Sequence, residues 1–135
     1  SNGVLLGREG RPLPGDLVFF RDTYDRNGDG RPDDPLTHVG VVERVRADGA
    51  VTFLHRGSRA VARGTLSLRH PSTERGPSGQ RWNSQLRAAR PGDRPGTRYL
   101  AGELFVAYGR FDAARIAAAL EGSADLSLSA LGFDE

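Results

Sequence analysis

Short apolar runs bounded by turn residues dominate the first half of the chain. The run LVFF at 17–20 follows a Pro-Gly-Asp step, and two Val-rich runs, 38–46 and 50–56, are joined through Asp48-Gly49. Runs of this length are typical of strands, and an Asp-Gly step between two of them favours a hairpin. We therefore expect a buried strand at 17–20 and an antiparallel hairpin over 38–56.

The second half of the chain is less regular. Apolar and polar residues alternate at 64–68, and apolar residues return at 104–108, so a strand is predicted at each place. Between them, 69–98 is rich in Pro, Gly, Ser and Arg, which indicates surface loop with one short helix at 82–89. Trp82 is expected to anchor this loop, with a groove wall for sugar or peptide as the alternative.

The C-terminal residues predict a helix. Asp112 is a suitable N-cap for a helix at 113–121, and the tail beyond contains three Leu and one Phe, so we expect the tail to dock. We divide the chain into a sheet domain at 1–110 and a C-terminal helix with docked tail at 111–135. Strands and helices do not alternate regularly, which favours an α+β fold with an antiparallel sheet and few helices.

Composition excludes some classes of function. The chain has 135 residues, 37% of them hydrophobic, which is enough for one core. All 19 basic residues are Arg, spread among 17 acidic residues for a formal net charge of +2, so we expect no nucleic-acid partner. No apolar run approaches the roughly 18 residues of a membrane span, so we expect none. The first residues also lack the pattern of a signal peptide.

Two residue types are missing from these 135 residues. Without Cys, the sequence itself offers no disulfide, no thiolate metal ligand and no thiol nucleophile. Met is missing too, and we interpret the chain as a piece of a longer protein.

Two histidines stand at the ends of the predicted hairpin strands, His38 at the start of one and His55 at the end of the next. A two-residue turn at Asp48-Gly49 pairs Val42 with His55 and places both imidazoles on one face, whereas a bulge at Gly49 places them on opposite faces. Even on one face they are about four residues out of register, roughly 13 Å along the strand. From the residues alone, two ordinary half-exposed strand histidines remain an open alternative to a joint site.

Three segments in order resemble the CHAP and NlpC families of papain-like cysteine peptidases and amidases. They are PGDLVFF at 14–20, THVGVVE at 37–43 and DGAVTFLH at 48–55, with a looser match at 98–102. Together they cover about half of the chain, and their order and spacing suit the CHAP variant. The resemblance implies a papain-like fold with an antiparallel sheet.

The resemblance also implies an activity, the hydrolysis of amide bonds in bacterial cell-wall peptides by a Cys-His-polar triad. His38 corresponds to the catalytic base and His55 to the group that orients its ring, a chemistry that suits an imidazole titrating near neutral pH. Gly40 and Asp16 are expected to border the substrate groove. The implied partner is a peptidoglycan stem peptide, no cofactor is required, and the implied location is secreted, periplasmic or elsewhere in the cell envelope.

The chain departs from these families at the nucleophile. Their Cys begins a helix some tens of residues before the Pro-Gly-Asp strand, whereas only 13 residues precede Pro14 here and none is Cys. The chain is therefore a piece of a peptidase whose Cys-bearing helix lies elsewhere, an inactive relative that binds peptide or is stabilised by calcium, or a protein of another activity. A missing half of the fold exposes apolar sheet, so the Cys-bearing segment or a second copy of the chain is an expected partner.

An acidic loop precedes the hairpin. Asp25, Asn27, Asp29 and Asp33 place oxygen ligands at positions 1, 3, 5 and 9 of a calcium-type loop with Gly at position 6. Position 12 is Leu36 where an EF-hand has Glu, and no helix pattern flanks the loop. The pattern predicts a structural Ca²⁺ site, with a solvated acidic turn as the alternative.

Overall fold

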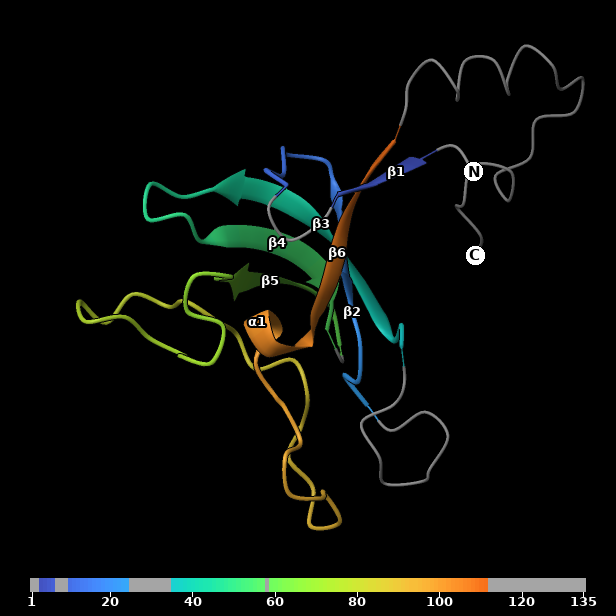
Figure 1. The fold of residues 1–135 in the computed structure, drawn as a ribbon, viewed down its shortest axis with the longest axis vertical. Helices are drawn as coiled ribbons and strands as arrows, with labels where there is room; N and C mark the ends of the chain where they lie inside the picture. Colours follow the sequence, from blue (N-terminus) through green and yellow to red (C-terminus); the bar gives the residue numbers. More distant parts are fainter. Residues whose placement is uncertain (1–2, 7–9, 25–34, 58, 112–135) are drawn as a thin grey trace, which may run out of the picture.

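A computed structural model describes residues 3–6, 10–24, 35–57 and 59–111 (Figure 1). Within these residues a six-stranded antiparallel sheet has the order β1-β6-β2-β3-β4-β5, and one short helix, α1, precedes the last strand. The elements are β1 (Gly3–Leu6), β2 (Leu17–Phe20), β3 (His38–Val45), β4 (Val51–Arg56), β5 (Val61–Leu66), α1 (Ala101–Leu104) and β6 (Phe105–Phe111). The predicted α+β class with an antiparallel sheet and few helices is confirmed.

The apolar runs predict most of the sheet. The strand expected at 17–20 is β2, and the expected hairpin is formed by β3 and β4. The strand expected at 64–68 begins and ends earlier, as β5, and the one at 104–108 continues to Phe111 as β6. β1 is an additional strand that the pattern does not predict. The helix expected at 113–121 and the docked tail lie outside the described residues.

The prediction of a short helix at 82–89 is wrong. The backbone N–H groups of Trp82 and Asn83 donate to the carbonyl of Glu74, and that of Ser84 donates to Thr65 in β5. In a helix over these residues the N–H groups of Leu86 and Arg87 would donate to the carbonyls of Trp82 and Asn83, but both donate to the carbonyl of Tyr99, which excludes the helix. Ser84 instead lies beside the edge strand β5, and Gln85 forms an isolated β-bridge with Leu100.

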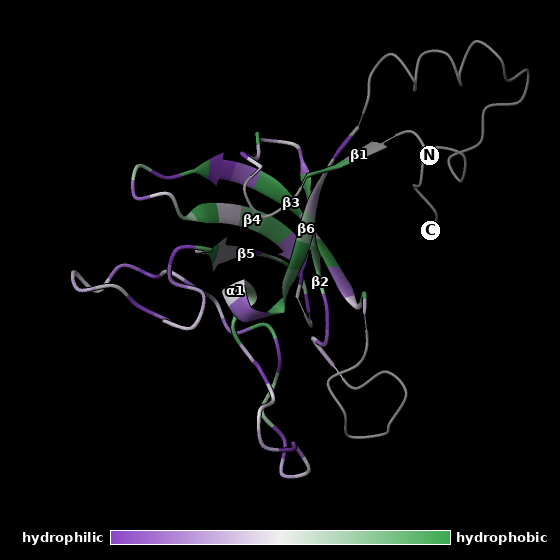
Figure 2. Ribbon diagram, viewed as in Figure 1, coloured by the Kyte–Doolittle hydropathy of each residue, from purple (hydrophilic) through white to green (hydrophobic). Residues whose placement is uncertain are grey.

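The core lies on one face of the sheet, which we call the core face. Its buried side chains come from β2 to β6 and from α1: Val18, Phe20, Val42, Val51, Phe53, Leu66, Ala101, Leu104, Phe105 and Tyr108. Figure 2 shows hydrophobic residues concentrated on the central strands, while the long loop between β5 and α1 is mostly hydrophilic. Burying one such Leu, Val or Phe side chain contributes roughly 1.5–3 kcal/mol, so this face supplies the main driving force for folding.

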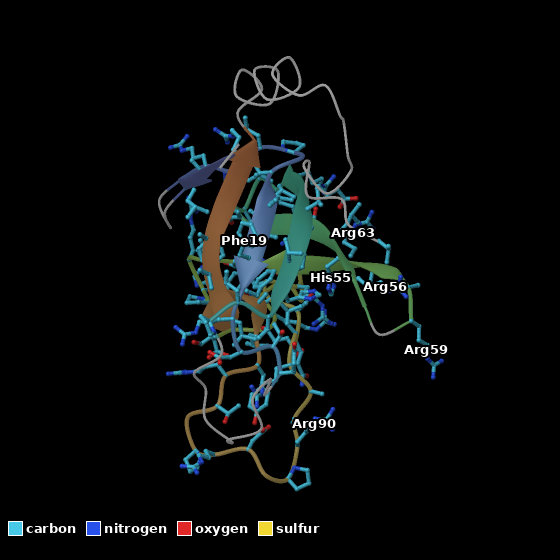
Figure 3. The ribbon with its side chains drawn as sticks, turned by 90° about the vertical axis from the view of Figure 1, so that its right-hand side faces the viewer. Phe19, His55, Arg56, Arg59, Arg63 and Arg90 are labelled. Carbon is cyan, nitrogen blue, oxygen red and sulfur yellow. The ribbon has the colours of Figure 1, made fainter. Side chains whose placement is uncertain are left out.

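The opposite face, which we call the outer face, exposes apolar side chains. Val39, Val41 and Leu54 are 48%, 42% and 39% exposed. The half-buried Phe19 of β2 pairs with Val39 of the neighbouring strand β3. Figure 3 looks onto this face, on which Phe19 is labelled. Strand side chains alternate between faces, so these residues cannot reach the core. These residues form an exposed apolar patch on the face opposite the core. The predicted partner, the Cys-bearing segment or a second copy of the chain, stays a prediction.

Candidate functional site

The hairpin of β3 and β4 brings His38 and His55 together through two irregularities. The first lies at the turn, where the N–H of Arg46 donates to the carbonyl of Ala50 (2.7 Å) and Gly49 has φ +87°. Three residues rather than two therefore connect the strands, and glycine supplies the left-handed conformation that this connection requires.

The second irregularity is a β-bulge at Glu43. Beyond it His55 pairs with Gly40, so the predicted pairing of His55 with Val42 is wrong by two positions. Each one-residue shift turns side chains to the other face, and two shifts restore a common face. They also bring His55 to within two residues of His38 along the ladder, instead of four.

The two imidazoles are in direct contact. Nε2 of His38 and Nδ1 of His55 lie 2.8 Å apart, a hydrogen-bond distance, and the ring planes are perpendicular. Both rings are half-buried at the edge of the core face, where the ring centroid of Phe20 lies 6.2 Å from His38 and that of Phe53 lies 5.2 Å from His55. The two histidines therefore lie much closer than the roughly 13 Å along the strand that a regular register implies. His55 lies beside β3 in Figure 3.

The surroundings favour neutral imidazoles. Burial lowers the pKa of His38, and burial together with the nearby charge of His38 lowers the pKa of His55. In a neutral pair one ring donates and the other accepts. When His38 carries its proton on Nε2 and donates to His55, Nδ1 of His38 is left as a proton acceptor. Neither Nδ1 of His38 nor Nε2 of His55 makes a hydrogen bond with any described residue.

Gly40 lies beneath the histidines, on the core face, and is buried. A Cβ at this position would lie 2.9 Å from the ring of Phe53, 3.1 Å from the carbonyl oxygen of Leu54 and 3.2 Å from Val18. The space that we expected to be open for substrate is therefore filled by Phe53. Glycine at this position lets the Phe53 ring pack under the histidine pair.

Asp16 lies at the opposite end of β2 from the histidines, because Phe20 is the β2 residue that pairs with His38. Its carboxylate accepts from Nε and Nη2 of Arg110 (3.0 and 2.9 Å) and from the N–H of Leu13 (2.7 Å). Burial alone would raise the pKa of Asp16, but these hydrogen bonds and the charge of Arg110 lower it overall. The bonds of Asp16 therefore link the start of β2 to β6. Asp16 lies roughly 13 Å along the strand from the histidine pair.

The expected calcium ligands Asp25, Asn27, Asp29 and Asp33 lie outside the described residues. Among the residues that the structure describes, no three His, Cys, Asp or Glu side chains are placed to hold a metal ion together. The structural Ca²⁺ site therefore stays a prediction. Calorimetric titration with calcium tests it, and heat indistinguishable from that of buffer would remove it.

Asn83, which the sequence pattern does not single out, is fully buried and bonded at every polar position. Its Oδ1 accepts from the N–H groups of Ser67 (2.9 Å) and Gly102 (2.8 Å), and its Nδ2 donates to the carbonyls of His70 (2.7 Å) and Thr73 (3.0 Å). One Asn in a polar loop carries no sequence signal for such a position. We refer to this group of bonds as the Asn83 hub.

Trp82 precedes the hub and stacks on His70, with ring centroids 3.9 Å apart and planes 7° from parallel. Its indole also lies against Gly76, where a Cβ would come within 2.7 Å of the ring. These contacts support the expected role of Trp82 as an anchor of the long loop.

The chain matches no protein-family model, no curated protein and no solved structure. Support for a function therefore comes from the geometry of the histidine pair and from the resemblance of the three segments. No helix among the described residues has the length and apolar character needed to cross a bilayer.

Proposed function

We propose that His38 and His55 are the base and the positioning residue of an amide-hydrolysing site of the Cys-His-polar type. The observation that carries the proposal is the 2.8 Å contact between Nε2 of His38 and Nδ1 of His55. When His55 accepts from Nε2 of His38, Nδ1 of His38 is available to a nucleophile, and the bond on the other nitrogen holds the ring orientation. A base held in this way by a third polar group is the arrangement that activates a nucleophile for acyl transfer.

In this proposal the thiol proton moves to Nδ1 of His38, and the thiolate attacks the carbonyl carbon of the amide. The imidazolium then gives the proton to the leaving amine nitrogen as the carbon–nitrogen bond breaks. Water then attacks the resulting thioester while His38 accepts the water proton, and the imidazolium returns this proton to the sulfur as the carbon–sulfur bond breaks. His55 accepts the Nε2–H of His38 throughout, and the lowered pKa of His38 keeps the ring in the neutral form that the first step requires.

The thiolate in this proposal comes from outside these 135 residues, which contain no Cys. We infer that the sheet is the strand half of a papain-like fold and that a helix carrying the Cys completes it. The three segments that resemble the CHAP and NlpC families support this inference, because they form the neighbouring strands β2, β3 and β4. The substrate class, peptidoglycan stem peptides, and a location in the cell envelope follow from the same resemblance.

A second candidate function is a binding module that holds stem peptide without cleaving it. The lack of Cys in the sequence favours this alternative. The two candidates share a substrate and differ in chemistry, so one assay on cell walls separates them.

The experiment compares this chain with the polypeptide that its whole reading frame encodes, using peptidoglycan labelled with a dye. Both proteins are expected to sediment with the walls, but only the longer one is expected to release soluble dye. In the longer protein, His38→Ala should lower the release rate by at least about 100-fold, the usual contribution of a general base. His70→Ala is the matched control and should leave the rate unchanged, because His70 stacks on Trp82 away from the pair.

His55 is tested as a positioning residue through the pH profile of dye release. His55→Asn keeps an acceptor for the Nε2–H of His38 and should retain more activity than His55→Ala, with a shifted acid limb. If the longer protein with His38→Ala releases dye at the wild-type rate, the proposal is overturned. Sedimentation without release by the longer protein assigns the chain to the binding class instead.

A further inference from the structure

A cavity of about 730 Å³ lies on the core face, at the end of the sheet away from the histidine pair. Its walls come from residues 10–14, from the turn end of the β3–β4 hairpin and from the end of β5 and the residues after it. Val45, on its wall, is seven positions along β3 from His38, roughly 23 Å at the rise of a strand. The cavity is therefore separate from the proposed amide-hydrolysing site, and a ligand bound in it would touch neither histidine.

The floor of the cavity is apolar. Val51, Leu66 and Tyr108 lie at its base and are at most 4% exposed. Pro12 and Pro14 form part of the wall, and the more exposed apolar residues that line the cavity are Leu13, Val45 and Leu68. The volume falls within the roughly 300–1,000 Å³ that is usual for small-molecule sites in proteins. An apolar body of a few carbons can therefore displace water from this floor.

The rim of the cavity is positively charged. Arg11, Arg44 and Arg69 line it from three separate segments, and none of the described lining residues is acidic. The side chain of Arg69 lies over the turn, since a Cβ on Gly49 would be 3.4 Å from its Nε.

The described arginines fall into two groups, those that form ion pairs with carboxylates and those, Arg56, Arg75 and Arg90 among them, that form none with any described residue. Seven arginines elsewhere form ion pairs with carboxylates. The three rim arginines form none with any described residue. The charge of Arg44 also lowers the pKa of the neighbouring Glu43, so the charge of this guanidinium is partly compensated. Guanidinium groups around a concave apolar surface concentrate positive potential there, and guanidinium binds carboxylate and phosphate in bidentate fashion.

We propose that this cavity binds a small amphiphilic anion, a carboxylate or phosphate joined to a short apolar body. The anionic group lies at the arginine rim and the apolar body lies on the floor. A concavity walled by three segments suits a free molecule, whereas a membrane surface needs cationic groups that project from a convex or flat face.

Calorimetric titration of the chain with octanoate tests the proposal, with octyl phosphate as a second arm that compares the two headgroups. Acetate lacks the apolar body and octan-1-ol lacks the charge, so each should bind at least about tenfold more weakly than octanoate. Arg44→Gln and Arg69→Gln should each weaken octanoate binding about tenfold, and Arg69→Lys should weaken it less because the charge remains. Arg90→Gln is the matched control, since Arg90 is an exposed arginine on the loop at the far end of the molecule (Figure 3).

Thermal unfolding of each variant establishes that it is folded. Octanoate binding that is unchanged by both glutamine variants overturns the proposal, as does octan-1-ol binding as tightly as octanoate. Failure of octanoate and octyl phosphate to bind, combined with arginine-dependent binding to anionic phosphatidylglycerol vesicles, also overturns it and assigns the rim to a membrane surface. None of these outcomes depends on cleavage of cell walls.

Discussion

The histidine pair lies at the edge of the core face and the Asn83 hub lies between β5 and α1, and the two differ in how much of their hydrogen-bonding capacity the fold uses. Asn83 makes four bonds, one for each of its two donors and two acceptor positions. His38 and His55 share a single bond, and one nitrogen of each ring has no partner among the described residues. A saturated polar group holds segments together, whereas one with unused capacity can bind or move a proton. The comparison therefore separates architecture from candidate chemistry.

The largest expected effect is at the hub. Asn83→Ala removes four hydrogen bonds and leaves backbone groups unsatisfied where β5, the long loop and α1 meet. We expect the free energy of unfolding in urea to fall by at least about 3 kcal/mol. Gln85→Ala is the control, because Gln85 is exposed and donates one bond, to Arg87; its loss should stay below about 1 kcal/mol. A loss at Asn83 no larger than at Gln85 would contradict the assignment.

The second effect connects packing to the histidine pair. Gly40→Ala places a Cβ against the ring of Phe53, and we expect a loss of about 1–3 kcal/mol from overpacking. The displaced ring also flanks His55, so the ¹⁵N shifts of His55 should move. In a Phe53→Leu background the same substitution should cost less, since the smaller side chain leaves room. Equal costs in both backgrounds would show that Phe53 is not the obstacle.

The third effect is a pH dependence that the hub cannot have. Folding lowers the pKa of His38 and of His55 from 6.5, so the unfolded chain takes up more protons as the pH falls below that value. The stability is therefore complete above about pH 6.5 and decreases as the pH approaches the folded pKa values, by at most about 1.4 kcal/mol per pH unit for each proton. Urea unfolding between about pH 7.5 and 5.5 measures this slope.

His38→Gln should flatten the slope, because it removes one titrating ring and its charge beside His55. Glu43→Gln is the control and should leave the slope unchanged in this range. Hydrogen bonds from Arg63 and Thr52 hold the pKa of Glu43 at about 2, far below the interval measured. A slope that is the same in the wild type and in His38→Gln would show that the pair does not titrate as described.

The smallest effect is expected at the third histidine. His70→Ala removes the ring that stacks on Trp82, and we expect a loss of about 0.5 kcal/mol, because His70 is exposed. The backbone carbonyl of His70 still accepts from Asn83, so the hub persists. The ¹⁵N shifts of His38 and His55 should not change. If the free energy of unfolding falls as much as in Asn83→Ala, the stack of Trp82 on His70 is part of the hub.

The central strands were predictable from sequence because apolar runs and turn residues are local signals. LVFF at 17–20 and the Val-rich runs on either side of Asp48-Gly49 lie where those signals place them. The stretch at 82–89 was not predictable, since its conformation depends on bonds to Glu74 and Thr65 that no local pattern indicates.

The candidate site divides in the same way. Residue type and order suggested His38 and His55, but their contact depends on a bulge at Glu43 that nothing in the sequence of β3 predicts. Gly40 and Asp16 were expected, from the resemblance, to border the substrate groove. In the structure Gly40 packs against Phe53, and Asp16 pairs with Arg110. Both contacts join residues in or beside different strands, so they form only when the sheet is assembled.

The bulge also bears on how such a site arises and is lost. Deleting the single codon for Glu43 would leave only the shift at the turn, which turns the two imidazoles to opposite faces of the sheet. Every histidine would remain in the gene, and an inventory of residues would detect no loss. In a lineage of related chains, insertions and deletions within this hairpin would therefore mark the gain or loss of the pair more sharply than substitutions of the histidines themselves.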